Sequence, residues 1–224
     1  MILCLAGVLD CANLTRTGEI LAKGAFVDGK LTAGWHARKV KENRQLGQGS
    51  EAIQAGSIVV DALLRHEVFR SAVLPLKLRP VLFSRTDPDM SYGTHIDDAV
   101  MGSEAAMLVR SDVSVTVFLG DPAGYDGGEL ILESVGGEMG YKLEAGAAIA
   151  YPSTSLHRVS PVTHGRREVA VTWAQSMVRS AERREILFDL DTARRAIFKS
   201  GGKSAEFDLI TKSYANLLRQ WAEV

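Results

Sequence analysis

This sequence of 224 residues contains little cysteine and almost no net charge. Its two cysteines, Cys4 and Cys11, are too few for a disulfide framework, and no Cys/His spacing typical of a zinc site accompanies them. We therefore expect free, buried thiols in a reducing cytoplasm, and the predicted location is cytoplasmic. The 26 Lys and Arg residues nearly balance the 27 Asp and Glu residues, which leaves a formal charge of −1. Without a global basic field, nucleic acid is not an expected partner.

Long apolar runs are also missing. No stretch approaches the roughly 20 apolar residues of a membrane span, so no membrane partner is expected. The apolar run from Ile2 to Leu9 is short and lacks a cationic lead, which predicts a first strand and not a signal peptide. Hydrophobic residues make up 46% and charged residues 24% of the chain, a mix that excludes a disordered chain, a fibre or a coiled coil. The length suits one large domain, or a domain with a small appendage.

Apolar residues recur at helical spacing towards both ends of the chain. The predicted helices are 11–25, 50–69, 180–199 and 207–224, with Gly201 and Gly202 as a helix stop between the last two. Between the first two helices, the segment 26–50 is polar and punctuated by glycine. Its charged cluster, which is typical of a solvated face, comprises Arg38, Lys39, Lys41, Glu42 and Arg44.

The middle of the chain consists of short β-rich runs separated by turns. These runs are 113–119, 129–133, 147–151 and 169–173. Several short strands without helices between them are typical of an antiparallel sandwich or jelly roll. We therefore expect a mainly β protein with flanking helices, of the α+β class, in which an N-terminal helical part and a C-terminal helical cap enclose a β-barrel-like domain.

Two histidines and one aspartate lie in or beside the β region in a pattern that suggests a metal site. If His95 and Asp97 belong to an extended segment, their side chains point to the same face, because strand side chains alternate. They would supply two ligands of a 2-His-1-carboxylate triad, which leaves open positions on a non-haem Fe(II). His157 follows an apolar strand and is the natural candidate for the third ligand, since a jelly roll brings distant strands together.

An arginine opens the last β-rich run. By alternation Arg167 shares a face with Val169, Val171 and Trp173, and the two valines make that face the inner one. An inward arginine is costly without an anionic partner, and its guanidinium fork can bind a carboxylate with two hydrogen bonds. Each feature also has an ordinary structural interpretation, because an isolated H-x-D is usually a surface pair and Arg166 with Arg167 fits a strand edge. Their order along the β elements favours the site.

Nine blocks of this sequence are similar to those of one known family, almost from end to end. They are Leu31–Trp35, Val40–Asn43, Tyr92–Asp97, Arg110–Ser114, Tyr125–Leu130, Tyr151–Val159, Trp173–Arg179, Leu187–Asp191 and Asn216–Val224. On these blocks the chain resembles the PKHD-type hydroxylases, a bacterial family of Fe(II)- and 2-oxoglutarate-dependent dioxygenases linked to iron uptake. The Tyr-Asp-Gly-Gly-Glu-Leu and Ser-Leu-His-Arg-Val segments are far more specific than H-x-D.

The resemblance implies a double-stranded β-helix, jelly-roll or cupin-like, at residues 80–178. An N-terminal helical and mixed segment, 1–79, is expected to pack on this core, and a C-terminal helical cap, 179–224, to follow it. The resemblance also implies that His95, Asp97 and His157 are the iron ligands, with no catalytic residue beyond them. It implies that Arg167 binds the distal carboxylate of 2-oxoglutarate, with Arg166 as its rival.

The implied activity couples decarboxylation of 2-oxoglutarate to succinate with hydroxylation of a C–H bond. The implied cofactors are Fe(II), 2-oxoglutarate as co-substrate and L-ascorbate as reductant. The partners would be O2 and an unidentified small-molecule or peptide substrate, with a connection to iron uptake or homeostasis and a possible homo-oligomer through the helical flanks. The alternatives are a non-catalytic iron-binding or iron-sensing β-barrel and a zinc hydrolase with the same ligands.

The chain departs from the family's pattern in the stretch 84–86 and at Thr94, just before His95, where relatives often have an aromatic residue. Relatives usually carry Asn-Arg-Tyr before the H-x-D motif, where this chain has Ser84, Arg85 and Thr86. The hydroxyl of that tyrosine is suited to binding the co-substrate, and Thr86 is shorter. We therefore expect a difference in co-substrate affinity or in the substrate's shape.

Overall fold

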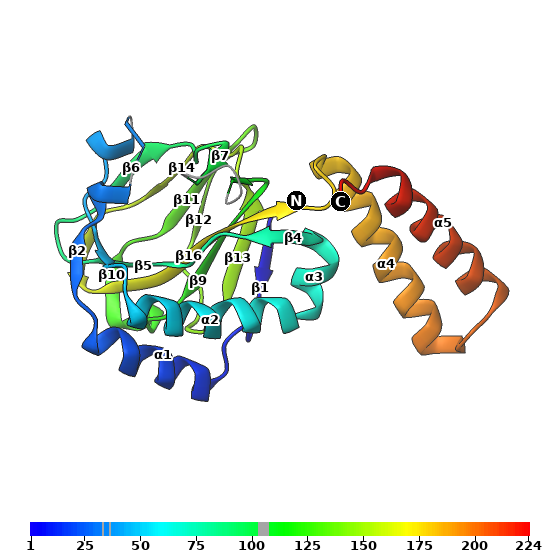
Figure 1. Ribbon diagram of the computed structural model, residues 1–224, viewed down its shortest axis with the longest axis horizontal. Helices are drawn as coiled ribbons and strands as arrows, with labels where there is room; N and C mark the ends of the chain where they lie inside the picture. The colour runs from blue at the N-terminus through cyan, green and yellow to red at the C-terminus, as the bar shows by residue number, and fades with distance from the viewer. Residues whose placement is uncertain (33, 36, 103–107) are drawn as a thin grey trace.

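The computed structural model describes residues 1–32, 34–35, 37–102 and 108–224, and two antiparallel β-sheets form its centre (Figure 1). The major sheet has the strand order β1 (Leu3–Leu5), β13 (Ala148–Pro152), β9 (Val113–Phe118), β16 (Arg167–Ser176), β5 (Leu82–Thr86), β3 (Arg44–Leu46) and β2 (Phe26–Asp28), with β4 (Pro75–Leu78) also paired to β16. The minor sheet has the order β12 (Gly137–Tyr141), β11 (Leu130–Ser134), β14 (His157–Val159) and β6 (Tyr92–His95). The expected mainly β core is confirmed.

The two sheets face each other across an apolar cluster. Leu130 and Leu132 of β11 pack against Phe118 of β9, Ile149 of β13 and Val169 of β16. Two short strand pairs complete the β structure, β10 (Tyr125–Gly127) with β15 (Val162–Gly165) and β7 (Val100–Met101) with β8 (Val109–Arg110). Side chains from both sheets thus close the interior of the barrel.

Strand β9 shows why the major sheet can be covered on both faces. Its sequence alternates valine with Ser114, Thr116 and Phe118, and all six residues are buried. The valines at 113, 115 and 117 belong to the core under the helices, whereas Ser114 and Thr116 face the interior of the barrel. Because side chains alternate along a strand, one strand serves the helical core and the barrel interior at once.

Helices α1 (Cys11–Lys23), α2 (Ser50–Arg65) and α3 (Glu67–Val73) cover the outer face of the major sheet (Figure 1). Val59 and Leu63 of α2 are fully buried in the same cluster as Phe83 of β5. The helix predicted over 50–69 is interrupted at His66, whose Nδ1 accepts a hydrogen bond from the Phe69 amide at 3.3 Å. His66 therefore caps α3.

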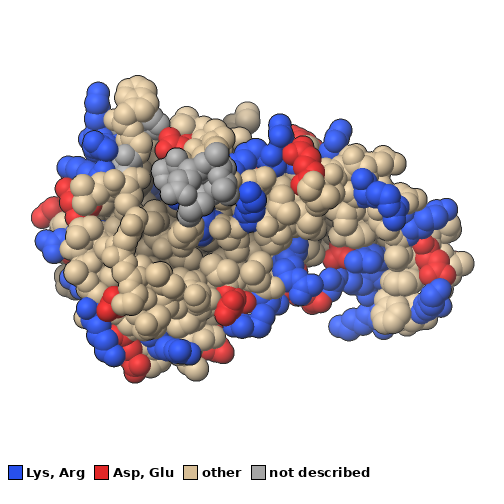
Figure 2. All heavy atoms as spheres, in the orientation of Figure 1, with Lys and Arg blue, Asp and Glu red and all other residues tan. Residues whose placement is uncertain are grey.

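Helices α4 (Ala181–Gly201) and α5 (Ala205–Trp221) form a hairpin beside the end of the barrel, next to α3 (Figure 1). Leu187 of α4 and Val178 are fully buried with Leu74, and Leu218 and Trp221 of α5 pack against them. Ser180 and Ser204 cap the two helices by accepting hydrogen bonds from backbone amides. On the face shown in Figure 2, both basic and acidic side chains lie over the hairpin, among uncharged ones.

The polar segment 26–50 is more structured than its composition suggests. It supplies β2 and β3 and two 3₁₀ turns, η1 (Gly29–Thr32) and η2 (Ala37–Lys39). Lys41 belongs to the charged cluster interpreted as a solvated face, and for this residue the interpretation is wrong, because only 5% of it is exposed. Pairing of β3 with β5 draws this part of the chain onto the barrel.

The expectation of buried thiols is also wrong, because Cys4 and Cys11 are both exposed. Cys4 lies on the edge strand β1, where alternation directs Leu3 and Leu5 into the core and the thiol away from it. Cys11 begins α1 at the surface. None of the described helices is long and apolar enough to cross a membrane.

Candidate active site

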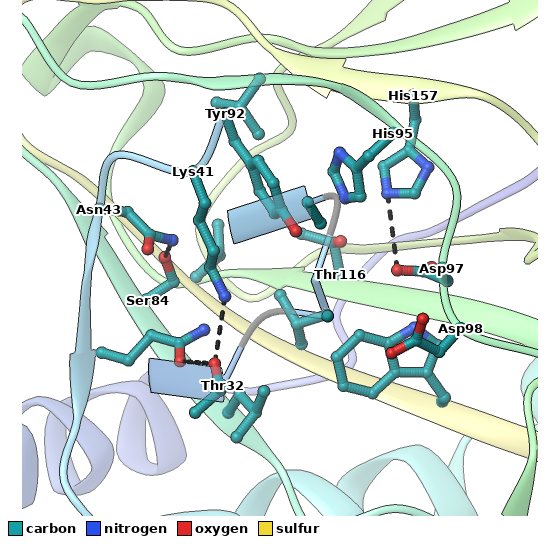
Figure 3. A pocket seen from close by; sticks show the side chains of 18 of the residues that line it. Thr32, Lys41, Asn43, Ser84, Tyr92, His95, Asp97, Asp98, Thr116 and His157 are labelled. Carbon is teal, nitrogen blue, oxygen red and sulfur yellow. Dashed lines mark hydrogen bonds and ion pairs between the residues drawn. The ribbon is translucent and has the colours of Figure 1, made fainter. Parts of the chain in front are cut away.

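The minor sheet brings His95, Asp97 and His157 together (Figure 3). His95 ends β6, His157 begins β14, and the two residues are direct partners across the antiparallel pair. Asp97 follows β6 by two residues. One ligand atom from each side chain lies within 4.8 Å of the others, and His157 Nε2 is 3.9 Å from Asp97 Oδ1. Two imidazoles and one carboxylate therefore converge on a single point.

Backbone carbonyls fix the orientation of both imidazole rings. His95 Nδ1 lies 2.9 Å from the Gly93 carbonyl oxygen, and His157 Nδ1 lies 3.0 Å from the Ser155 carbonyl oxygen. Donation from each Nδ1 leaves Nε2 unprotonated, which is the tautomer that a metal ligand needs. Each histidine is held by the residue two positions before it, so the local chain sets the geometry.

Serine side chains orient the carboxylate. Ser114 of β9 donates a hydrogen bond of 2.6 Å to Asp97 Oδ2, and Ser153 lies 2.7 Å from the Ser114 hydroxyl. Both serines are almost fully buried. Because Ser114 occupies Oδ2, Asp97 presents Oδ1 towards His157. Polar residues at inward positions of a valine-rich strand are the sequence signal that points to Ser114, and the sequence analysis missed it.

Burial and its histidine neighbour keep His95 neutral. Desolvation, followed by the positive charge that His157 can carry, lowers the pKa of His95 to about 4. Tyr92 stacks on the His95 ring, with centroids 3.7 Å apart and planes 15° apart, and burial raises the pKa of its phenol. His95 can therefore bind a cation near neutral pH without first releasing a proton.

A cavity of about 500 Å³ opens from the three-residue centre into the barrel. Alternating residues of two central strands line it, namely Leu82, Ser84 and Thr86 of β5 and Arg167, Val169, Val171 and Trp173 of β16. Alternation predicts a shared inner face for the four β16 residues, and all four do line the cavity. Polar and apolar side chains share the lining about equally, so the cavity can offer a small molecule both apolar contact and several polar partners.

Arg167 and Arg166 point in opposite directions. Arg167 is 3% exposed and lines the cavity, and its Nε is buried without a hydrogen-bond partner in the described part of the chain. Burial lowers the pKa of Arg167, although a guanidinium remains charged at neutral pH. Arg166 is about half exposed, and its Nε is 2.6 Å from Asp87 Oδ1. Of these two arginines, it is therefore Arg167 that offers the cavity a donor without a partner in the described part of the chain.

The Tyr-Asp-Gly-Gly segment makes room for this arginine. Gly128 has a φ of +68°, and a Cβ atom at this position would lie 3.0 Å from Arg167 Cδ. Gly127 has a φ of +71°, and its Cβ would lie 2.0 Å from the Pro161 carbonyl oxygen. Glycine is needed at both positions because any side chain would collide there and because positive φ favours glycine. The turn thus lets the Arg167 side chain pass along the barrel wall.

Comparisons with known proteins identify the class. Residues 81–175 match the 2OG-Fe(II) oxygenase superfamily. A prolyl hydroxylase from Trichoplax adhaerens, solved in complex with a hypoxia inducible factor peptide fragment, aligns with a TM-score of 0.56 at 15% identity, over 83% of this chain and 86% of that one. An oxidoreductase of the 2OG-Fe(II) oxygenase family from Burkholderia pseudomallei aligns with a TM-score of 0.55 at 20% identity, over 78% and 84% of the chains. The chain is a 2OG-Fe(II) oxygenase with a double-stranded β-helix core.

Relatives of the same length narrow the class to a family. A PKHD-type hydroxylase from Gloeothece citriformis is 56% identical over 223 residues, and one from Acaryochloris marina is 53% identical over 224 residues, each alignment covering 100% of both chains. Residues 182–223 match the PKHD-type hydroxylase C-terminal domain. The chain belongs to the PKHD-type hydroxylases, and it is therefore a 2-oxoglutarate-dependent dioxygenase.

Proposed function

We propose that His95, Asp97 and His157 hold the Fe(II) of this dioxygenase and that Arg167 binds the distal carboxylate of 2-oxoglutarate. The observation that carries the proposal is the convergence of the three ligand atoms within 4.8 Å at the end of a cavity that also contains Arg167. Two neutral imidazoles and a carboxylate are the donor set of non-haem Fe(II) oxygenases and leave open positions for co-substrate and O2. The orphaned Arg167 Nε fits an anionic ligand.

The residues of the chain supply orientation, charge and a dry surrounding. When bound, Fe(II) with 2-oxoglutarate and O2 supplies the oxidation of a C–H bond, and 2-oxoglutarate leaves as succinate and CO2. The carbonyls of Gly93 and Ser155 hold the imidazoles, and Ser114 holds the carboxylate. Arg167 fixes the far end of the co-substrate, which orients its keto acid towards the metal. Val169 and Val171, on the same face of β16 as Arg167, line the cavity with apolar surface that would help to exclude water from the bound co-substrate.

The finer features of the proposal follow from the family. The substrate is a small molecule or a peptide connected with iron uptake or homeostasis, and L-ascorbate returns oxidised iron to Fe(II). A cytoplasmic location accords with two free thiols in the sequence. Thr86, which pairs with Arg167 across β5 and β16, replaces the family's tyrosine beside the co-substrate.

The test is succinate production from 2-oxoglutarate with Fe(II) in the wild-type protein and in His95→Ala. Loss of a metal ligand should reduce turnover by more than about 100-fold, since even residues that only orient ligands contribute about 10- to 100-fold. His164→Ala is the matched control, because His164 is an exposed histidine on β15.

Equal turnover in the wild type and in His95→Ala would contradict the assignment of His95. Tight iron uptake without any consumption of 2-oxoglutarate would instead favour the iron-binding or iron-sensing barrel.

A further inference from the structure

The cavity contains a second buried cation that the proposed function does not use. Lys41 is 5% exposed and lines the cavity, and its side chain runs between Tyr92 and Thr32 (Figure 3). Lys41 and Thr32 come from two of the blocks singled out in the sequence, 40–43 and 31–35. Neither block supplies a proposed metal ligand or the co-substrate arginine, although both reach the cavity.

Lys41 has few partners for its charge. Its Nζ donates a hydrogen bond of 3.1 Å to Thr32 Oγ1, and the Thr32 hydroxyl in turn donates to Gln45 Oε1. Nζ also lies 5.3 Å from the centroid of the Tyr92 ring. Within the described part of the chain, Lys41 forms no ion pair with a carboxylate. A buried ammonium with one neutral hydrogen-bond partner is costly, and a ligand of opposite charge offsets that cost.

The two cations of the cavity occupy different surroundings. Glu129 is the carboxylate whose charge acts on Arg167, since burial raises the pKa of the phenols of Tyr125 and Tyr151 and keeps them neutral. The charges that act on Lys41 come from Asp97 and Asp28. The two cations thus have different acidic neighbours, and Lys41 lies in a polar surrounding of its own, formed by Thr32 and the ring of Tyr92.

We propose that Lys41 binds a carboxylate, or an equivalent oxyanion, of the primary substrate and so makes this dioxygenase specific for anionic substrates. The inference rests on the proposed function, because it assigns Arg167 to 2-oxoglutarate. The lining of the same cavity also includes the exposed apolar residues Leu31, Ile96 and Val100. A substrate with an anionic group and an apolar portion matches this lining.

A matched pair of probes, 4-fluorobenzoate and 4-fluorobenzamide, separates charge from shape. Fluorine NMR records how strongly Mn(II) in the metal site relaxes each probe when the protein is saturated with 2-oxoglutarate. In the wild type, 4-fluorobenzoate should bind at least about 10-fold more tightly than the amide, since one charge-assisted hydrogen bond contributes about 1.5–3 kcal/mol. Lys41→Met should abolish the preference, and Lys41→Arg should retain most of it. Lys39→Met, a change at a neighbouring exposed lysine, should leave it intact.

Three results would overturn the inference. The first is equal binding of the two probes to the wild type, and the second is an unchanged preference for 4-fluorobenzoate in Lys41→Met. The third is displacement of bound 4-fluorobenzoate by 2-oxoglutarate, which would place the probe's carboxylate in the co-substrate site. Calorimetric titration of the Mn(II)-loaded wild type with 2-oxoglutarate tests the proposed function by itself. Absence of co-substrate binding there would contradict the proposed function, whereas normal binding with no Lys41-dependent preference would contradict this inference alone.

Discussion

The two faces of the major sheet carry different side chains although the same central strands supply both. Phe83 and Val115 point outward into the apolar core under α2. Ser114, Thr116 and Arg167 point inward, where Ser114 holds Asp97 and the other two line the cavity. The outer face is apolar and well packed, whereas the inner face buries polar groups, one of them an unpaired guanidinium Nε. Stability and chemistry are thus distributed over alternate residues of the same strands.

The largest effect should follow a truncation on the outer face. Phe83→Ala removes a ring that is 1% exposed, and it should lower the free energy of unfolding by about 3–5 kcal/mol, as for other buried phenylalanines. Urea denaturation measures this loss. The folded fraction should keep its affinity for Mn(II), because the neighbouring residues Leu82 and Ser84 keep their places in the cavity. Leu209→Ala, at an exposed leucine of α5, is the control and should change stability by less than about 0.5 kcal/mol. Weakened metal binding with unchanged stability in Phe83→Ala would contradict this division of roles between the two faces of the major sheet.

On the inner face, Arg167→Met should raise the dissociation constant of 2-oxoglutarate by about 100-fold. A bidentate contact between arginine and carboxylate contributes roughly 3 kcal/mol, and each 1.4 kcal/mol is tenfold. Calorimetric titration of the Mn(II)-loaded protein measures the change. Arg166→Met is the matched control, since Arg166 is half exposed and paired with Asp87. A larger effect at Arg166 than at Arg167 would reverse the assignment.

The buried charge of Lys41 should lower the free energy of unfolding of the metal-free protein at neutral pH. Burial lowers its pKa from 10.5 to about 8, while the carboxylates of Asp97 and Asp28 oppose this shift. Between these two pKa values the unfolded chain binds more protons than the folded one, so this contribution to the free energy of unfolding rises with pH from about 8 to about 10.5. Lys41→Met should therefore be more stable than the wild type at pH 7 by up to about 3 kcal/mol.

The measurement for Lys41 is the difference in unfolding free energy between the wild type and Lys41→Met as a function of pH. The difference should shrink above pH 8. Because both proteins share the buried tyrosines, the titration of Tyr92 and Tyr151 largely cancels. A difference that stays constant from pH 7 to pH 10 would refute the buried cation.

The smallest expected effect concerns the serine that orients Asp97. Ser114→Ala should weaken Mn(II) binding by about 10- to 100-fold, the range for residues that hold a metal ligand. Titration with Mn(II) followed by electron paramagnetic resonance measures it. Ser57→Ala, at an exposed serine of α2, should leave the affinity unchanged. Equal affinities in wild type and Ser114→Ala would show that the Ser114 hydrogen bond has no part in positioning Asp97.

Strand alternation explains how much of this architecture could be predicted from the sequence. The run from Arg167 to Trp173 is long and regular enough to fix its inner face, and the apolar valines identify that face. The pairing of His95 with His157 needs one further step, because only the jelly-roll topology brings β6 beside β14. The helices at both ends follow from their apolar periodicity, with boundaries shifted by a few residues.

Lys41 could not be predicted in the same way. It lies in a polar segment whose strands β2 and β3 are three residues each, too short for a periodic signal. Its burial depends on long-range contacts, with β3 pairing to β5 and Lys41 bridging to Tyr92. The polar composition of the segment 26–50 indicates solvent exposure on average. It therefore does not reveal that the side chain of Lys41 is buried.

The direct pairing of His95 with His157 has a consequence for how the barrel opens. The strands that carry them, β6 and β14, have four and three residues, so few backbone hydrogen bonds join this pair, in which β6 is the edge strand of the minor sheet. If both rings bind one cation, as proposed, the cation would hold the two strands in one alignment, because a slip by one residue turns an imidazole outward. Without iron, we expect this strand pair to open before the rest of the barrel. Hydrogen–deuterium exchange of the metal-free protein should then be faster in β6 and β14 than in the other strands of the barrel. Iron supply would then govern how long the protein survives proteolysis as well as whether it turns over.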